Sequence, residues 1–101
     1  MTFRLIIRQS AERDLAEAFE WYEHQLSGLG SRFLLSVDAS LARITRMPEA
    51  YAPCFERFRR SLVRRFPYGI YFFIEEQTVI VIAVLHLYSN PQRIQRILEK
   101  H

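Results

Sequence analysis

The segment "RRSLVRRFPYGIYFFIEEQTVIVIAVLH", residues 59–86, decides the fold. It reads as three strands, "RRSLVRRF", "IYFFIEE" and "TVIVIAVLHL", which are joined by the short links "PYG" and "EEQ". Runs rich in β-branched and aromatic residues, separated by such short links, predict two consecutive antiparallel hairpins. These hairpins would form the centre of a sheet that the rest of the chain covers.

The residues before this segment predict a short strand and a helical hairpin. "FRLIIR", residues 3–8, reads as the strand, and Ser10 is a suitable N-cap for the first helix. "SGLG" ends this helix at Gly28, and Pro48 ends a second one. The apolar residues at helical spacing are Leu15, Phe19, Tyr22 and Leu26 in the first helix, and Phe33, Val37, Leu41 and Ile44 in the second.

The remaining segments complete an α+β layout. "PEAYAPCFE" reads as a loop before the hairpins, and Asn90 with Pro91 predicts the N-cap and first turn of a short last helix. The order is β-α-α-β-β-β plus the short C-terminal helix. We therefore expect one domain over residues 1–101, an antiparallel sheet with the helical hairpin packed on one face.

The last long strand predicts that both faces of the sheet are covered. Strict alternation places one set of apolar residues, Val79, Val81, Ala83 and Leu85, on one face and another set, Ile80, Ile82 and Val84, on the other. A helical hairpin covers only one face. The second face requires the C-terminal helix, another subunit or a bound partner, because an uncovered apolar face of this size is an interaction site.

Arginine dominates the charge of the chain. The net charge is +3, and 13 of the 14 basic residues are arginines. Five of them lie in "RFRRSLVRR", at Arg57, Arg59, Arg60, Arg64 and Arg65. In one interpretation they blunt a solvated edge strand. In the other they form a platform for phosphates or for a partner's acidic side chains, with Arg60 and Arg64 on the same face of the strand.

Several classes of protein are excluded or disfavoured. A single cysteine, Cys54, cannot form an internal disulfide and fits a reducing cytosol. The chain has no signal-peptide core and no stretch long enough to span a membrane. It has no spacing of ligands for a metal and no glycine loop for a phosphate-bearing cofactor. His86, at a strand end, is more often a structural residue than a general base.

The long segment also resembles a known family. "RRFPYGIYFFIEEQTVIVIAVLH" followed by "NP" resembles the end of the RelE/ParE toxin superfamily, the toxins of type II toxin–antitoxin modules. The "FPY.I.Y" hairpin and the terminal "VLH" carry the resemblance, and "SAERDLAEAFEWYEHQ" is also similar. The resemblance implies a cytoplasmic hetero-oligomer with a cognate antitoxin, whose acidic, partly disordered segment folds on the toxin.

The superfamily divides by target, and two positions favour one branch. RelE-like members cut messenger RNA on the ribosome, whereas ParE-like members poison DNA gyrase. RelE-like members tend to carry an arginine just after the hairpin tyrosine, where this chain has Gly69. Many members carry another before "NP", where it has Ser89. We therefore expect a ParE-like toxin that binds DNA gyrase, without a catalytic residue, cofactor or metal.

The resemblance and the charge pattern together give a set of candidate residues. Those expected to bind the antitoxin or the target are Arg57, Arg59, Arg60, Arg64, Arg65, Tyr71, Phe73, His86, Tyr88 and Arg93. The alternative is a RelE-like, ribosome-dependent mRNA endonuclease that uses Arg64, Arg65, His86 and Tyr88 as a substitute catalytic set. A further alternative is an inactive toxin homologue that acts only as a binding module.

Overall fold

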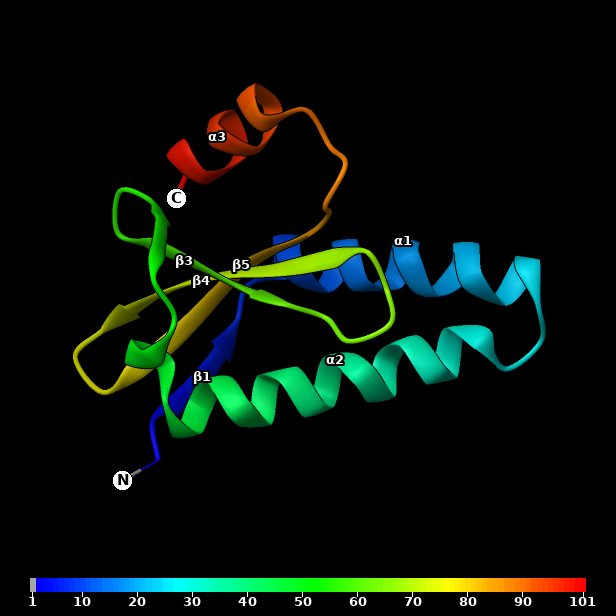
Figure 1. Ribbon diagram of the computed structural model, residues 1–101, viewed down its shortest axis with the longest axis horizontal. Helices are drawn as coiled ribbons and strands as arrows, with labels where there is room; N and C mark the ends of the chain where they lie inside the picture. Colours follow the sequence, from blue (N-terminus) through cyan, green and yellow to red (C-terminus); the bar gives the residue numbers. More distant parts are fainter. Residues whose placement is uncertain (1) are drawn as a thin grey trace.

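The predicted hairpins form the middle of a five-stranded sheet in the computed structural model, which describes residues 2–101 (Figure 1). The strand order across the sheet is β1-β5-β4-β3-β2. The strands are β1 (Arg4–Ile7), β2 (Pro53–Phe55), β3 (Phe58–Leu62), β4 (Tyr68–Glu75) and β5 (Thr78–His86). The helices are α1 (Gln9–Gln25), α2 (Leu29–Arg46), the 3₁₀ turn η1 (Pro48–Ala50) and α3 (Pro91–Glu99).

This architecture confirms the predicted α+β fold and adds two features at the edges of the sheet. The sheet is mixed rather than antiparallel, because β1 pairs in parallel with the first half of β5. The segment read as a loop contains β2, which pairs with β3 across a turn at Glu56, a residue with φ of 49°. Three residues that begin with Pro53 give too short a pattern to indicate a strand.

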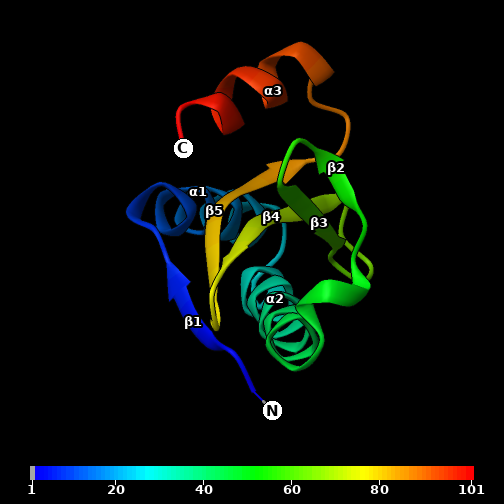
Figure 2. The same cartoon turned by 90° about the vertical axis from the view of Figure 1, so that its left-hand side faces the viewer.

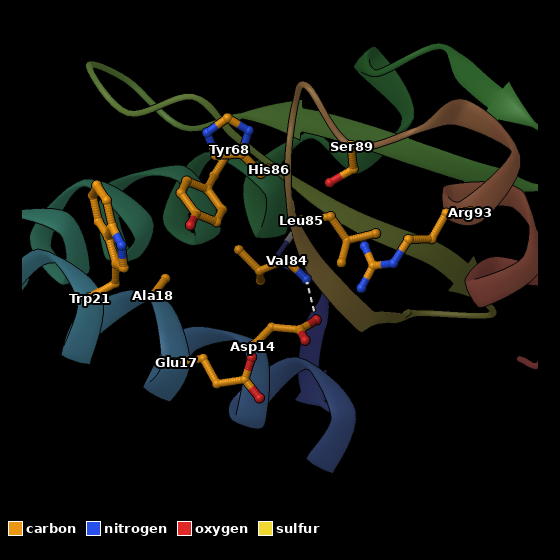
Figure 3. A pocket seen from close by; sticks show the side chains of 10 residues that line it. All are labelled: Asp14, Glu17, Ala18, Trp21, Tyr68, Val84, Leu85, His86, Ser89 and Arg93. Atoms are coloured by element: carbon orange, nitrogen blue, oxygen red, sulfur yellow. Dashed lines mark hydrogen bonds between the residues drawn. The ribbon is translucent and has the colours of Figure 1, made fainter.

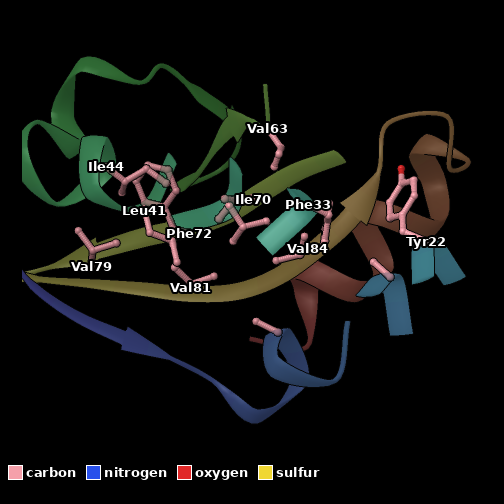
Figure 4. Packing of buried hydrophobic residues seen from close by; sticks show 13 residues of the cluster. Tyr22, Phe33, Leu41, Ile44, Val63, Ile70, Phe72, Val79, Val81 and Val84 are labelled. Carbon is pink, nitrogen blue, oxygen red and sulfur yellow. The ribbon is translucent and has the colours of Figure 1, made fainter. Parts of the chain in front are cut away.

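The helical hairpin packs on one face of the sheet and builds the larger core (Figure 4). The predicted stripe of α2 is buried in full, at Phe33, Val37, Leu41 and Ile44. On α1 the buried residues include Ala11 and Ala18. Because alanine side chains are small, they let this helix approach β5 closely. Leu26 lies outside the helix and is exposed.

Ser10 does not cap α1, so that prediction is wrong. The helix begins two residues earlier than a cap at Ser10 requires, at Gln9, with Arg8 as its N-cap. The Ser10 hydroxyl instead donates a hydrogen bond of 2.7 Å to the carbonyl oxygen of Ile82 in β5. The Ser10 hydroxyl is therefore engaged by a carbonyl oxygen of a distant strand and does not cap the N–H groups of its own helix.

A β-bulge in β5 changes which residues face the helical hairpin. Tyr71 of β4 pairs with Ala83, but Phe72 pairs with Val81, so Ile82 has no partner in β4. The extra residue reverses the alternation beyond it. Ala83 therefore packs in the second core and Val84 in the first, the reverse of the prediction. No periodic pattern in so apolar a strand signals the bulge.

The C-terminal helix covers the second face, one of the three predicted alternatives. α3 lies on the opposite side of the sheet from α2 (Figures 1 and 2). Leu98 is fully buried against a second core that includes Phe58, Tyr71 and Phe73. Asn90 caps this helix as predicted, because its side chain accepts a hydrogen bond of 2.8 Å from the N–H of Gln92.

Candidate functional site

The end of β5 is an edge of the sheet that α1 completes with side chains. β1 pairs only with residues 78–81, so the following part of β5 has no strand on that side, although β4 pairs with its other side. On this open side, opposite β4, Asp14 of α1 accepts a hydrogen bond of 2.9 Å from the N–H of Val84. Burial raises the pKa of the Asp14 carboxyl, although the hydrogen bond from Val84 opposes this effect.

Asp14 lines a cavity of about 280 Å³ between α1, the sheet and the segment before α3 (Figure 3). The lining residues are Asp14, Glu17, Ala18, Trp21, Tyr68, Val84, Leu85, His86, Ser89 and Arg93. Figure 3 shows Asp14 and Glu17 on α1, with Arg93 reaching in from the opposite side. The cavity therefore carries charges of both signs beside apolar and aromatic walls.

A row of aromatic rings borders this cavity. The ring centroid of His86 lies 5.2 Å from that of Tyr68 and 5.3 Å from that of Tyr88. Trp21 contacts the Tyr22 ring edge-on at 5.1 Å. Trp21 is 58% exposed and Tyr88 is 84% exposed. Large exposed aromatic side chains beside charged groups are typical of protein-binding surfaces.

Three of the predicted binding residues meet at this surface, namely His86, Tyr88 and Arg93. The Nδ1 atom of His86 accepts a hydrogen bond of 3.2 Å from the N–H of Tyr88, so this contact shapes the turn after β5. The residues missing from the prediction are those of α1. Asp14, Glu17 and Trp21 stand at positions i, i+3 and i+7, and this helical spacing could have placed them on one face.

The predicted arginine cluster does not form one platform. Arg59 donates hydrogen bonds to the carbonyl oxygens of Tyr51 at 2.6 Å and Glu49 at 3.2 Å, which holds the segment after α2 against the sheet. Arg57 lies over the ring of Phe73 at 3.9 Å. It also donates a hydrogen bond of 3.1 Å to the main-chain oxygen of His101. These two side chains support the fold around α3 and η1.

Arg64 and Arg65 lie in a turn, not in the strand. β3 ends at Leu62, and Arg65 has φ of 71°. The prediction that Arg64 shares a strand face with Arg60 is therefore wrong, because the chain leaves the sheet between them. Arg65 lines a cavity on the α2 side with Leu29, Arg32, Leu35, Ser36 and Phe66.

The two predicted aromatic binding residues, Tyr71 and Phe73, lie in the sheet beneath α3. Each is 1% exposed. Beside them, the side chain of Arg60 in β3 extends over Gly69. Within residues 2–101 no group of histidine, cysteine and carboxylate residues could hold a metal ion. No helix in this range is long and apolar enough to cross a membrane.

The sequence matches the model of a known family over residues 5–87, which includes the helical hairpin and every sheet strand except the first residue of β1. That family is described as the ParE toxin of the type II toxin–antitoxin system, parDE. The chain belongs to the ParE toxin family. Its predicted membership of the RelE/ParE superfamily, nearer to the ParE branch, is therefore confirmed, and so is its assignment as a toxin of a type II toxin–antitoxin module.

Relatives agree with this assignment of the ParE-family chain. It is 33% identical over 96 residues to Toxin ParE2 of Mycobacterium tuberculosis strains CDC 1551 / Oshkosh and ATCC 25618 / H37Rv, covering 94% of this chain and 91% of the relative. Its fold is similar to the chromosomal ParDE system from P. aeruginosa, with a TM-score of 0.77, 11% identity, and coverage of 85% of this chain and 97% of that one.

The fold also extends to the RelE branch. An E. coli RelE toxin mutant in the free state aligns with a TM-score of 0.72 and 15% identity over 99% of this chain and 98% of that one. The toxin–antitoxin complex RelBE2 from Mycobacterium tuberculosis contains a chain with a TM-score of 0.59 and 22% identity, covering 85% of this chain and 99% of that one. At these identities the likeness concerns the fold alone.

Proposed function

We propose that this toxin acts in the cytoplasm by binding DNA gyrase, and that a cognate antitoxin neutralises it in a hetero-oligomeric complex. Binding, rather than catalysis, is its means of action. The observation that carries the proposal is the match to the ParE family over residues 5–87, because gyrase is the target expected of that branch. The antitoxin is the second component of such a module.

The positions of the alternative catalytic residues support binding over RNA cleavage. A nuclease would bring an arginine and a general acid or base to one phosphate. Of the residues predicted for that alternative, His86 lines the cavity beside α1, whereas Arg65 lines a cavity on the α2 side. The arginine that shares the cavity of His86 is Arg93, which is not part of that set. Gly69 and Ser89 supply no arginine at the two positions where RelE-like members tend to have one.

The surface around His86 has the composition of a protein-binding site. Trp21 and Tyr88 present large exposed rings, and Asp14, Glu17 and Arg93 offer charges of both signs nearby. Interfaces concentrate their binding energy in such aromatic and arginine residues. We therefore assign this surface, centred on Trp21 and Tyr88, to contact with gyrase.

A supercoiling assay tests the target. Purified toxin is added to gyrase and relaxed plasmid, and we expect supercoiling to stop at near-stoichiometric toxin. Changing Trp21→Ala together with Tyr88→Ala should weaken inhibition about tenfold or more, as expected when hot-spot aromatic residues are removed. Leu35→Ala is the matched control, because Leu35 is also an exposed apolar residue, at 68%, but lies on α2.

A second assay separates the alternatives. If gyrase remains active at saturating toxin and messenger RNA is cut in a translating extract, the RelE-like endonuclease replaces this proposal. If neither happens, and cells grow normally when the chain is expressed alone, the inactive binding module replaces it. Co-expression with the protein encoded next to this gene tests the antitoxin, which should co-purify with the toxin and restore supercoiling.

A further inference from the structure

Arg60 fills the space that Gly69 leaves open on the α3 side of the sheet. A Cβ atom added to Gly69 would lie 2.9 Å from Cδ and 3.1 Å from Cγ of Arg60. These contacts are shorter than ordinary van der Waals distances, so the arginine stem depends on the absence of a side chain there. Gly69, which follows the hairpin residue Tyr68, therefore allows the side chain of Arg60 from the neighbouring strand β3 to lie across β4.

Next to Arg60 lies a buried hydroxyl that has no partner. Tyr71 stands opposite Arg60 in the β3–β4 ladder. Its hydroxyl oxygen is buried and makes no hydrogen bond with any described residue, 2–101. A buried hydroxyl without a partner destabilises the folded state, because it has lost its hydrogen bonds to water. A polar ligand that reached it would recover this loss.

Both side chains line one cavity of about 190 Å³ under the start of α3. The lining residues are Cys54, Phe55, Arg60, Tyr71, Leu87, Ser89, Pro91, Ile94, Gln95 and Leu98. Arg60 contributes the charge, and the tyrosine ring, Leu87, Ile94 and Leu98 contribute apolar walls. The cavity thus combines the Arg60 cation with a largely apolar lining, and the residue that carries the buried, unpartnered hydroxyl, Tyr71, forms part of its wall.

We propose that this cavity binds a carboxylate on an apolar stem, namely a glutamate or aspartate side chain of the antitoxin segment. This inference rests on the proposed function, which supplies the antitoxin. The Arg60 guanidinium would pair with the carboxylate, and the Tyr71 hydroxyl would donate a second hydrogen bond to it. The methylene groups of the stem would pack against Leu87 and Ile94.

The charge balance favours a carboxylate over a nucleic-acid phosphate. A single arginine matches a single negative charge, whereas an RNA or DNA chain brings a run of phosphates and needs a row of cations. The other basic side chains of this region are engaged elsewhere or lie away from the cavity. Arg57 lies over Phe73, Arg59 binds main-chain oxygens, and Arg64 lies in the turn beyond β3.

A small carboxylate tests the cavity without knowledge of the antitoxin sequence. Hexanoate is titrated into the isotope-labelled full chain, and the amide signals of Gly69, Ser89 and Ile94 should shift with a saturable curve. Hexanamide, which has the same stem without the charge, should bind at least tenfold more weakly. Hexanoate should also slow alkylation of Cys54 by N-ethylmaleimide, because this single cysteine lines the same cavity.

Three variants test whether hexanoate binds to the Arg60 guanidinium and the Tyr71 hydroxyl. Arg60→Gln should weaken hexanoate binding about tenfold or more, as expected for the loss of a charged partner. Tyr71→Phe should weaken it about threefold to tenfold while leaving the folded chain as stable or more stable, because the unpartnered hydroxyl is gone. Arg64→Gln removes the same charge outside the cavity and should leave binding unchanged.

The outcomes are distinct. If hexanoate produces no saturable shift, or if Arg64→Gln weakens it as much as Arg60→Gln, the proposal is overturned. It is also overturned if inorganic phosphate or an eight-nucleotide RNA binds more tightly than hexanoate and depends on both Arg60 and Tyr71. None of these results uses gyrase, so failure here is separate from failure of the supercoiling assay.

Discussion

Two glycines in the helical hairpin, Gly28 and Gly30, are required for different reasons. A Cβ on Gly30 would lie 2.7 Å from Cδ2 and 2.8 Å from the main-chain oxygen of Phe19, so this glycine permits close contact between α1 and α2. Gly28 has open space around it but a φ of +88°. The carboxylate of Glu23 accepts hydrogen bonds from both N–H groups, at 3.2 Å from Gly28 and 2.8 Å from Gly30.

Gly30→Ala should therefore destabilise the chain despite the higher helix propensity of alanine. The methyl group meets backbone as well as a ring, so the helices must separate, at a cost of about 1–3 kcal/mol. Urea unfolding measures the loss. Gly28→Asn is the control, because asparagine tolerates the left-handed conformation, and it should stay within about 1 kcal/mol of the wild type. A Gly30→Ala chain that is as stable as the wild type would contradict close packing at this point.

Asp14 makes the junction of α1 and β5 sensitive to pH. Because burial raises its pKa above the ordinary 3.8, the folded state favours the protonated carboxyl. This favourable contribution is fully present below the ordinary value and is lost as pH rises through the raised pKa. Asp14→Asn keeps an acceptor for the Val84 N–H but cannot ionise. The free energy of unfolding of this variant, relative to the wild type, should therefore increase from pH 3 to pH 7.

The matched variant Asp14→Leu isolates the hydrogen bond. It removes the acceptor and leaves the buried N–H of Val84 unpaired, which should cost about 1–3 kcal/mol relative to Asp14→Asn at every pH, because neither variant ionises. Equal stability of the asparagine and leucine variants at pH 7 would show that the contact has no role in holding the helix.

At the scale of elements, the end of α3 is fastened by two arginines. Nη1 of Arg8 lies 2.9 Å from Nδ1 of His101, and Arg57 holds the main-chain oxygen of the same residue. Burial, followed by the charge of Arg8, lowers the pKa of His101. A neutral imidazole is therefore favoured while α3 is docked, and docking weakens as pH falls through the ordinary value of 6.5 towards the lowered one.

Hydrogen exchange measures this effect. After correction for intrinsic rates, amides of α3 should exchange faster at pH 5.5 than at pH 7.5, relative to amides of β4. His101→Gln has no imidazole to protonate and should show a smaller difference between the two pH values. An unchanged difference in that variant would assign the pH effect to another group.

The sequence predicts an element well where a local pattern of residues is enough to determine it. The stripe of α2, the strands β4 and β5 and the Asn90 cap are of this kind, and the structure confirms them. Prediction from the sequence fails where a contact between distant parts of the chain overrides the local pattern. Ser10 bonds to β5 rather than capping α1, and the bulge at Ile82 reverses the faces of a strand that is apolar on both sides.

The residues of the candidate site also divide into those that the local sequence places and those that only long-range packing places. His86, Tyr88 and Arg93 come together because they are close in sequence, at the end of β5 and the start of α3. Arg64 and Arg65 separate from Arg60 because β3 ends at Leu62, and the end of the strand depends on how the chain turns toward β4 rather than on composition. Asp14 and Trp21 join the site only through the packing of α1 against β5, a contact between distant parts of the chain.

The whole molecule has two cores that differ in how firmly they are closed. The helical hairpin and the sheet enclose the first, and a single helix of nine residues closes the second. Short helices are marginal without tertiary contacts. α3 depends on Ile94, Ile97 and Leu98 for its packing. We therefore expect α3 to undock locally at a lower free energy than the rest of the chain unfolds.

Two matched leucine substitutions test this difference. Leu41 in the first core and Leu98 in the second are both buried, at 8% and 0% exposure. Leu41→Ala should lower the global free energy of unfolding by about 2–5 kcal/mol, as in other well-packed cores. Leu98→Ala should lower it less, because α3 can leave the sheet while the first core persists, but it should accelerate hydrogen exchange in α3 and at Tyr71 and Phe73 beneath it. If both variants lose the same global stability and α3 exchanges only by global unfolding, the two cores form one cooperative unit and α3 is not a separable cover.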